Sequence, residues 1–154
     1  MNQQGKLALG IVLLIVAAVI VVLQVRRLTH DPDKNQMLSD GQQAAQTQLG
    51  TLFGKVNGKW NNDALWVDKA SAKTGAAVGK EVFGDSPSMD NVKIIDARKD
   101  EENRDQDQIN VVLQVGDAEQ CVIVYIRKHP KSGDYVFATI EKSTMTVKEY
   151  KERL

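Results

Sequence analysis

Apolar and polar positions divide the chain into three stretches of different pattern. Residues 7–23 (LALGIVLLIVAAVIVVL) are seventeen successive positions without a polar side chain, and residues 24 and 25 extend the run as far as Arg26. A helix over residues 7–25 would rise about 28 Å, which is close to the hydrocarbon thickness of a bilayer, and a helix satisfies its own backbone there. The pattern therefore predicts a transmembrane helix over residues 7–25 of a single-pass, integral membrane protein.

Helical periodicity follows a polar juxtamembrane stalk at residues 26–37. Ser39 and Gln42 have the spacing of a capping box. Apolar residues then recur on one helical face, at Leu38, Ala45, Leu49, Leu52, Phe53 and Val56. This spacing predicts an amphipathic helix over about residues 40–55. A second helix is expected to begin at Asn62 or Asp63, to run through residue 70 and to resume over residues 76–82.

Beyond residue 90 the period changes from helical to alternating, which is typical of strands. Segments rich in Val, Ile and Tyr predict four strands, at residues 92–98, 109–115, 121–127 and 135–141. The third segment is apolar on both faces and is expected to lie centrally in the sheet. Short polar connectors favour antiparallel hairpins, and residues 148–153 favour a frayed final helix. Residues 38–154 are therefore predicted to form a soluble α+β domain, a cystatin-like roll with one or two helices packed on a four-stranded antiparallel meander.

Charge excludes one class of partner. The chain has 20 Lys+Arg and 20 Asp+Glu, but every acidic residue follows Arg27. Residues 28–154 therefore carry seventeen basic and twenty acidic residues, a formal charge of −3. A nucleic-acid binder needs a concentrated basic surface, so no nucleic-acid partner is expected. The single cysteine, Cys121, can close no intrachain disulfide and can build no thiolate metal site.

Residues with catalytic or metal-binding chemistry are sparse. His30 and His129 stand at no recognisable catalytic spacing, and Cys121 is better explained as a small apolar residue than as a nucleophile paired with His129. A calcium loop that began with residues 31–35 would need a glycine at its sixth position and an acid at its twelfth, but Gln36 and Gln42 stand there. The acidic run at residues 100–107 is typical of a solvent-facing connector. No cofactor, no metal site and no enzymatic activity are therefore expected.

The order of these features resembles a known family. The amino-terminal span, the helical segments and the break at residues 82–87 (VFGDSP) are followed by INVVLQVGDAEQCVIVYIRKHPKSGDYVFATIEK. This arrangement is similar to the cytochrome oxidase assembly factor 1 family over about residues 62–142. The shared features are an apolar strand ending at Val115-Gly116, a second apolar strand, a Lys/Arg-rich hairpin and a final aromatic strand. The resemblance implies a non-enzymatic, membrane-anchored assembly factor with its domain on the extracytoplasmic side.

Basic residues near the span bear on its orientation. Lys6 precedes the span, whereas Arg26, Arg27 and Lys34 follow it. By the positive-inside bias this difference of about one charge favours a cytoplasmic domain, the opposite of what the family resemblance implies. This charge difference is too small to outweigh the family resemblance, so we expect the soluble domain to lie on the extracytoplasmic side.

A tethered domain without evident chemistry suggests binding as its function. In the first hypothesis, a face or an edge of the sheet binds a protein partner near the membrane. The candidate partner-binding residues are Trp66 and, expected on one face of the last strand, Tyr135, Phe137 and Thr139. For Trp60 and Trp66 the alternative is a core role, in which they hold the helices on the sheet.

Two further hypotheses stay open. The roll could instead enclose a small ligand in an apolar pocket. The residues expected to line such a pocket are Leu49, Phe53, Leu113 and Val124. In the last alternative, the chain is a purely structural subunit of a membrane complex.

Overall fold

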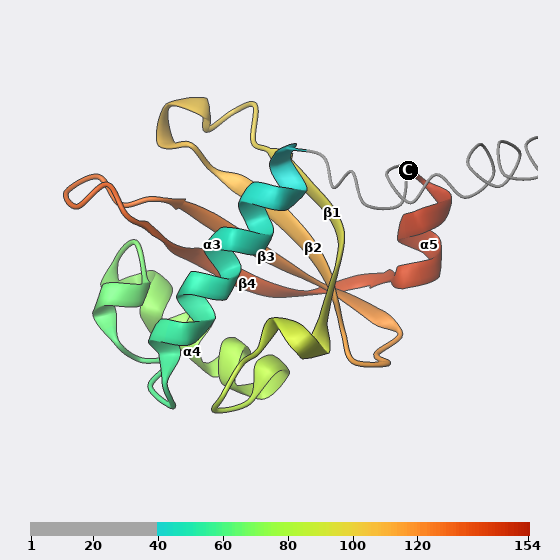
Figure 1. Cartoon of the computed structure of the whole chain (residues 1–154), viewed down its shortest axis with the longest axis horizontal. Helices are drawn as coiled ribbons and strands as arrows, with labels where there is room; N and C mark the ends of the chain where they lie inside the picture. Colours follow the sequence, from blue (N-terminus) through green and yellow to red (C-terminus); the bar gives the residue numbers. More distant parts are fainter. Residues whose placement is uncertain (1–39) are drawn as a thin grey trace, which may run out of the picture. The chain divides into compact units, whose positions relative to one another are not determined.

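A computed structural model describes residues 40–154, and Figure 1 shows its elements. The helices are α3 (Asp40–Val56), α4 (Lys69–Phe83) and α5 (Val147–Glu152), with a 3-10 turn at Asp63–Leu65 between the first two. The strands are β1 (Val92–Lys99), β2 (Ile109–Val115), β3 (Gln120–Lys128) and β4 (Tyr135–Thr146). The predicted span at residues 7–25, the stalk at residues 26–37 and the start of the domain at residue 38 lie outside the described residues. None of the helices between residues 40 and 154 combines the length and the hydropathy that a bilayer crossing needs.

The four strands form one antiparallel sheet in the order β1-β2-β3-β4, which confirms the predicted α+β class and the meander. β3 lies between β2 and β4, as its two apolar faces predicted. Val124 pairs with Val111 of β2 and with Ile140 of β4, and all three side chains are buried. β4 continues to Thr146, beyond its predicted end at residue 141.

The main core lies between one face of the sheet and the helices α3 and α4. α3 contributes the apolar face that its spacing predicted, with Ala45, Leu49, Leu52, Phe53 and Val56 all buried. A smaller apolar cluster lies on the other face, at one end of the sheet, where α5 packs. Its members are Ile95, Val112, Cys121 and Val147, with Ile123 and Tyr150 packed against them. Much of the remaining outer face is therefore left without a helix over it.

The predicted start of the second helix is wrong. Asn62 does act as a cap, since its Oδ1 accepts the N–H of Ala64 at 3.1 Å, but the 3-10 turn ends at Leu65. The chain then becomes extended along β4, where the N–H of Val67 donates to the carbonyl oxygen of Phe137 at 2.9 Å. A tertiary hydrogen bond therefore overrides the local helical pattern.

Asp68 caps α4, which then runs unbroken from Lys69. Its Oδ1 accepts the N–H of Ser71 at 2.7 Å, and this hydrogen bond lowers the pKa of Asp68 from its ordinary value. Because the folded-state pKa is the lower one, the stabilising contribution is present above the unfolded-state value of 3.8 and is lost as the pH falls through the folded value.

We expect Asp68→Asn to preserve the cap while removing one source of acid sensitivity. Urea unfolding at neutral pH should give nearly the same free energy of unfolding for this variant as for the wild type, and Asp68→Ala should give a lower one. Below the unfolded-state pKa the wild type should lose more stability than Asp68→Asn. An equal loss in both proteins would show that the cap does not titrate.

Candidate functional site

A surface hollow of about 550 Å³, here called the hairpin hollow, lies between the 3-10 turn and the hairpin that joins β3 to β4. Its floor consists of two apolar side chains that the protein itself almost covers, those of Leu65 and Trp66, each 1% exposed. Side chains of both charges and several hydrogen-bonding groups form its rim, including Lys55, Asp63, His129, Asp134 and Tyr135. Of the four predicted partner-binding residues, Trp66 and Tyr135 meet here.

Trp66 is held rigidly in the floor. Its Nε1 donates to the carbonyl oxygen of Trp60 at 2.7 Å, and its ring packs on that of Phe137 with the centroids 5.2 Å apart. With its polar atom bonded inside the protein and only 1% of the residue exposed, Trp66 offers a partner almost no surface of its own. Trp60 is buried too, so the core alternative for both tryptophans is confirmed.

The prediction that Tyr135, Phe137 and Thr139 share one face is wrong for Thr139, whereas Tyr135 and Phe137 do lie on the same face. Phe137 pairs with Ile126 and points into the core, whereas Thr139 pairs with Tyr125 on the opposite face of the sheet. The register shifts between these two pairs, and the one extra residue in β4 reverses the alternation of side chains. Phe137 is fully buried, so it has no surface to present to a partner.

His129 belongs to the site although no spacing in the sequence indicated it. Its Nδ1 accepts the backbone N–H groups of Lys131 at 3.2 Å and of Ser132 at 3.4 Å, which fixes the ring within the turn. In a neutral imidazole the other nitrogen, Nε2, then carries the proton and is a hydrogen-bond donor. The only signal for this residue in the sequence was its place in a predicted hairpin turn.

Tyr135 is tied to the neighbouring loop through Lys128. The Nζ of Lys128 lies 5.8 Å from the centroid of the Tyr135 ring and 2.6 Å from Oδ2 of Asp107. The hydrogen bond to Asp107 raises the pKa of Lys128, and the same bond lowers the pKa of Asp107. These contacts connect the hairpin with the acidic connector between β1 and β2.

The acidic connector is organised from within by Asp100. Its carboxylate accepts the side-chain amides of Gln108 at 2.9 Å, Asn103 at 3.2 Å and Asn110 at 3.3 Å. Hydrogen bonds, the one from Asn103 foremost, lower the pKa of Asp100. With its oxygens occupied by donors, this carboxylate serves to shape the loop. Within residues 40–154 no group of three or more His, Cys, Asp and Glu side chains is placed to hold a metal ion.

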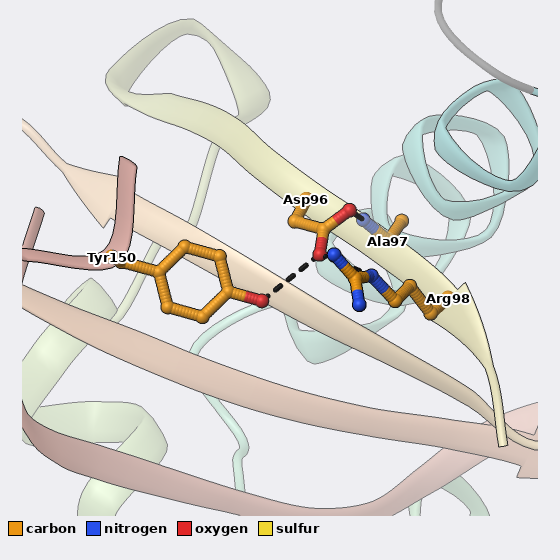
Figure 2. Close-up of polar contacts among 4 residues, drawn as sticks. All are labelled: Asp96, Ala97, Arg98 and Tyr150. Atoms are coloured by element: carbon orange, nitrogen blue, oxygen red, sulfur yellow. Dashed lines mark hydrogen bonds and ion pairs between the residues drawn. The ribbon is translucent and has the colours of Figure 1, made fainter. Parts of the chain in front are cut away.

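Figure 2 shows a second polar cluster, which attaches α5 to β1. The Tyr150 hydroxyl donates to Oδ2 of Asp96 at 2.9 Å, and the Nε of Arg98 lies 2.7 Å from the same oxygen. The other oxygen of Asp96 accepts the N–H of Ala97 at 2.9 Å. Burial, followed by the bond to Asp96, raises the pKa of Tyr150. The cluster thus serves as an attachment for α5.

Cys121 lies in the apolar cluster that α5 covers. The thiol is fully buried, and this burial raises its pKa, which disfavours the reactive thiolate. Because Cys121 lies at the start of β3 and His129 follows its end, the structure does not bring them together as a catalytic pair. Cys121 therefore packs as a small apolar residue.

The side chains that would line an internal ligand pocket pack in the core instead. Leu49, Phe53, Leu113 and Val124 are each at most 3% exposed and belong to one hydrophobic cluster. A ligand enclosed among them would need space that these side chains occupy.

Both edges of the sheet carry features that disfavour the addition of a strand. At β4, Val67 already donates to the Phe137 carbonyl on the free edge. At β1, the register shifts between Ile94 and Asp96, and the resulting irregularity twists the edge away from regular pairing. The hairpin hollow is therefore a better place for a partner than either of these edge segments.

No family model, curated protein or solved structure matches this chain. The resemblance to the cytochrome oxidase assembly factor 1 family therefore stays a prediction.

Proposed function

We propose that this chain is a membrane-anchored, non-enzymatic interaction domain that binds a protein partner near the membrane, as an assembly factor does. The observation that carries the proposal is the hairpin hollow, in which charges of both signs and a histidine surround an apolar floor. A polypeptide segment suits such a surface, because it offers donors, acceptors and apolar groups together. A small molecule suits it less well, since the almost covered floor leaves little apolar surface for it to bury.

The apolar run at residues 7–23 supports the membrane tether. A tether keeps the domain within reach of other membrane proteins and raises their effective concentration, so a contact as small as the hairpin hollow can be sufficient. The resemblance to the cytochrome oxidase assembly factor 1 family suggests that the partner belongs to an assembling membrane complex. It also suggests that the domain lies on the extracytoplasmic side, which protease accessibility in sealed vesicles would test.

We expect a photoreactive amino acid at position 64 to cross-link a partner in the native membrane. Ala64 is exposed and lines the hairpin hollow, so a partner segment seated there would come within reach. The matched control is position 51 on α3, where Thr51 is exposed but lies outside the hollow. Mass spectrometry of the adducts should find one polypeptide enriched from position 64 and absent from position 51.

The same experiment in a Tyr135→Ala background tests whether the hollow itself makes the contact. Removing this aromatic ring from the rim is expected to lower the yield of the adduct roughly tenfold. Intrinsic tryptophan fluorescence checks that the variant remains folded, because both tryptophans lie in the core. Identical adducts from positions 64 and 51, or an adduct that does not depend on Tyr135, would contradict the proposed site.

A further inference from the structure

The turn after α3 contains the single Asn-Gly step of the chain, at Asn57 and Gly58. Asn57 is exposed and has a φ of 40°, in the left-handed region that residues with a side chain seldom adopt, and Gly58 follows with a φ of 77°. In such a step the next backbone nitrogen can attack the side-chain amide of asparagine, because glycine carries no side chain to hinder the approach. This is the place where the chain is most prone to lose an amide group.

In the folded chain the attacking nitrogen is already engaged. The N–H of Gly58 donates to the carbonyl oxygen of Asp85 at 2.9 Å, which ties the turn after α3 to the turn after α4. Beside it, the Nε1 of Trp60 donates to the carbonyl oxygen of Gly84 at 2.7 Å. The Trp60 side chain is buried, so the donor of this second bond is held in place by the core. The two bonds act between adjacent positions and hold the two turns together.

We propose that Asn57 is a site of self-catalysed deamidation and that the Gly58–Asp85 hydrogen bond slows this reaction in the folded protein. When the two turns separate, the Gly58 nitrogen loses its proton to solvent and attacks the side-chain carbonyl carbon of Asn57. A carbon–nitrogen bond forms to give a cyclic imide, the bond to the amide nitrogen breaks, and ammonia leaves with a proton taken from solvent. Water then opens the imide at either carbonyl, which leaves aspartate or its β-linked isomer at position 57.

The product alters the junction between α3 and α4. A carboxylate at position 57 places a negative charge at the carboxyl end of α3, where the helix dipole is also negative. The β-linked isomer adds a carbon to the backbone and displaces the Gly58 N–H from Asp85. Deamidation is irreversible, so its product accumulates among copies of the protein in which this junction has opened.

The test follows conversion at Asn57 in the full chain, held in detergent and in mildly alkaline buffer. Trypsin cleaves after Lys55 and Lys59, so residues 56–59 are released as one peptide that contains Asn57. Mass spectrometry then reads the change from amide to acid. We expect conversion of the folded wild type to be at least roughly tenfold slower than in denaturant. Equal rates in the two conditions would overturn the proposal.

Two variants test whether the contacts between the turns after α3 and α4 slow the deamidation of Asn57. Trp60→Phe keeps an aromatic ring but loses the donor to Gly84, and it is expected to speed conversion roughly five-fold. Val112→Ala removes buried apolar volume on the other face of the sheet, and it should leave the rate within about twofold of the wild type. If Trp60→Phe deamidates at Asn57 as slowly as the wild type, or at the same rate as Val112→Ala, the junction between the two turns does not protect Asn57 and the proposal is overturned.

If Trp60→Phe does not fold, hydrogen exchange of the wild type tests independently whether the Gly58 N–H is protected in the folded protein. The Gly58 amide should exchange far more slowly than an amide without a protein acceptor, since its N–H is held by Asp85. Exchange at the rate of an open amide would overturn the proposal.

Discussion

Gly75→Ala is expected to lower the free energy of unfolding by about 2–3 kcal/mol. A Cβ added at Gly75 would lie 2.2 Å from Cζ3 and 2.3 Å from Cη2 of Trp66, much closer than atoms can approach. The ring cannot retreat, because it packs on Phe137 and its Nε1 donates to the Trp60 carbonyl. This clash outweighs the gain of about 1 kcal/mol that alanine otherwise brings to a helix interior.

Gly54→Ala provides the matched control on the neighbouring helix. Gly54 is exposed in α3, and nothing lies within 4 Å of an added Cβ. Its replacement should therefore raise the free energy of unfolding by about 0.5–1 kcal/mol. Urea unfolding of the full chain in detergent, followed by tryptophan fluorescence, measures both variants. A neutral Gly75→Ala would show that the Trp66 ring has room to move, against the packing described above.

The elements that the sequence predicted well are those governed by local periodicity. The apolar face of α3, from Ala45 to Val56, was predictable because a helix that buries one face leaves its 3.6-residue period in the sequence. The strands followed the same logic with a period of two. The second helix was misplaced because the bond from Val67 to Phe137 joins segments distant in sequence, and no local pattern records such a contact.

The candidate site was predictable only in part. Trp66 and Tyr135 were singled out as aromatic residues in a chain that has few, but their meeting in one hollow depends on how the 3-10 turn packs against the hairpin. Thr139 was assigned to the wrong face because the shift of register in β4 has no signature in an alternating pattern. His129 was overlooked as a candidate site residue because its position in the hollow arises from the turn that surrounds it.

Phe137→Ala is expected to lower the free energy of unfolding by about 3–5 kcal/mol, measured by the same urea titrations. Its ring is fully buried, with centroids 5.2 Å from Trp66, 5.8 Å from Trp60 and 6.5 Å from Phe53. Truncation would leave a cavity among these rigid rings. Thr139→Ala, on the same strand but on the opposite face, is half-buried and should change the free energy by no more than about 0.5 kcal/mol.

This pair separates the effects of folding from those of partner binding. Phe137 packs on Trp66 but does not line the hairpin hollow, so a loss of cross-linking in Phe137→Ala would reflect damage to the core, and the contact has to be tested at Tyr135. Thr139→Ala remains folded on these expectations and leaves the hollow intact, so it should cross-link as the wild type does. If it instead loses the adduct, the partner lies on the outer face, where Thr139 pairs with Tyr125, and the hairpin hollow is not the binding site.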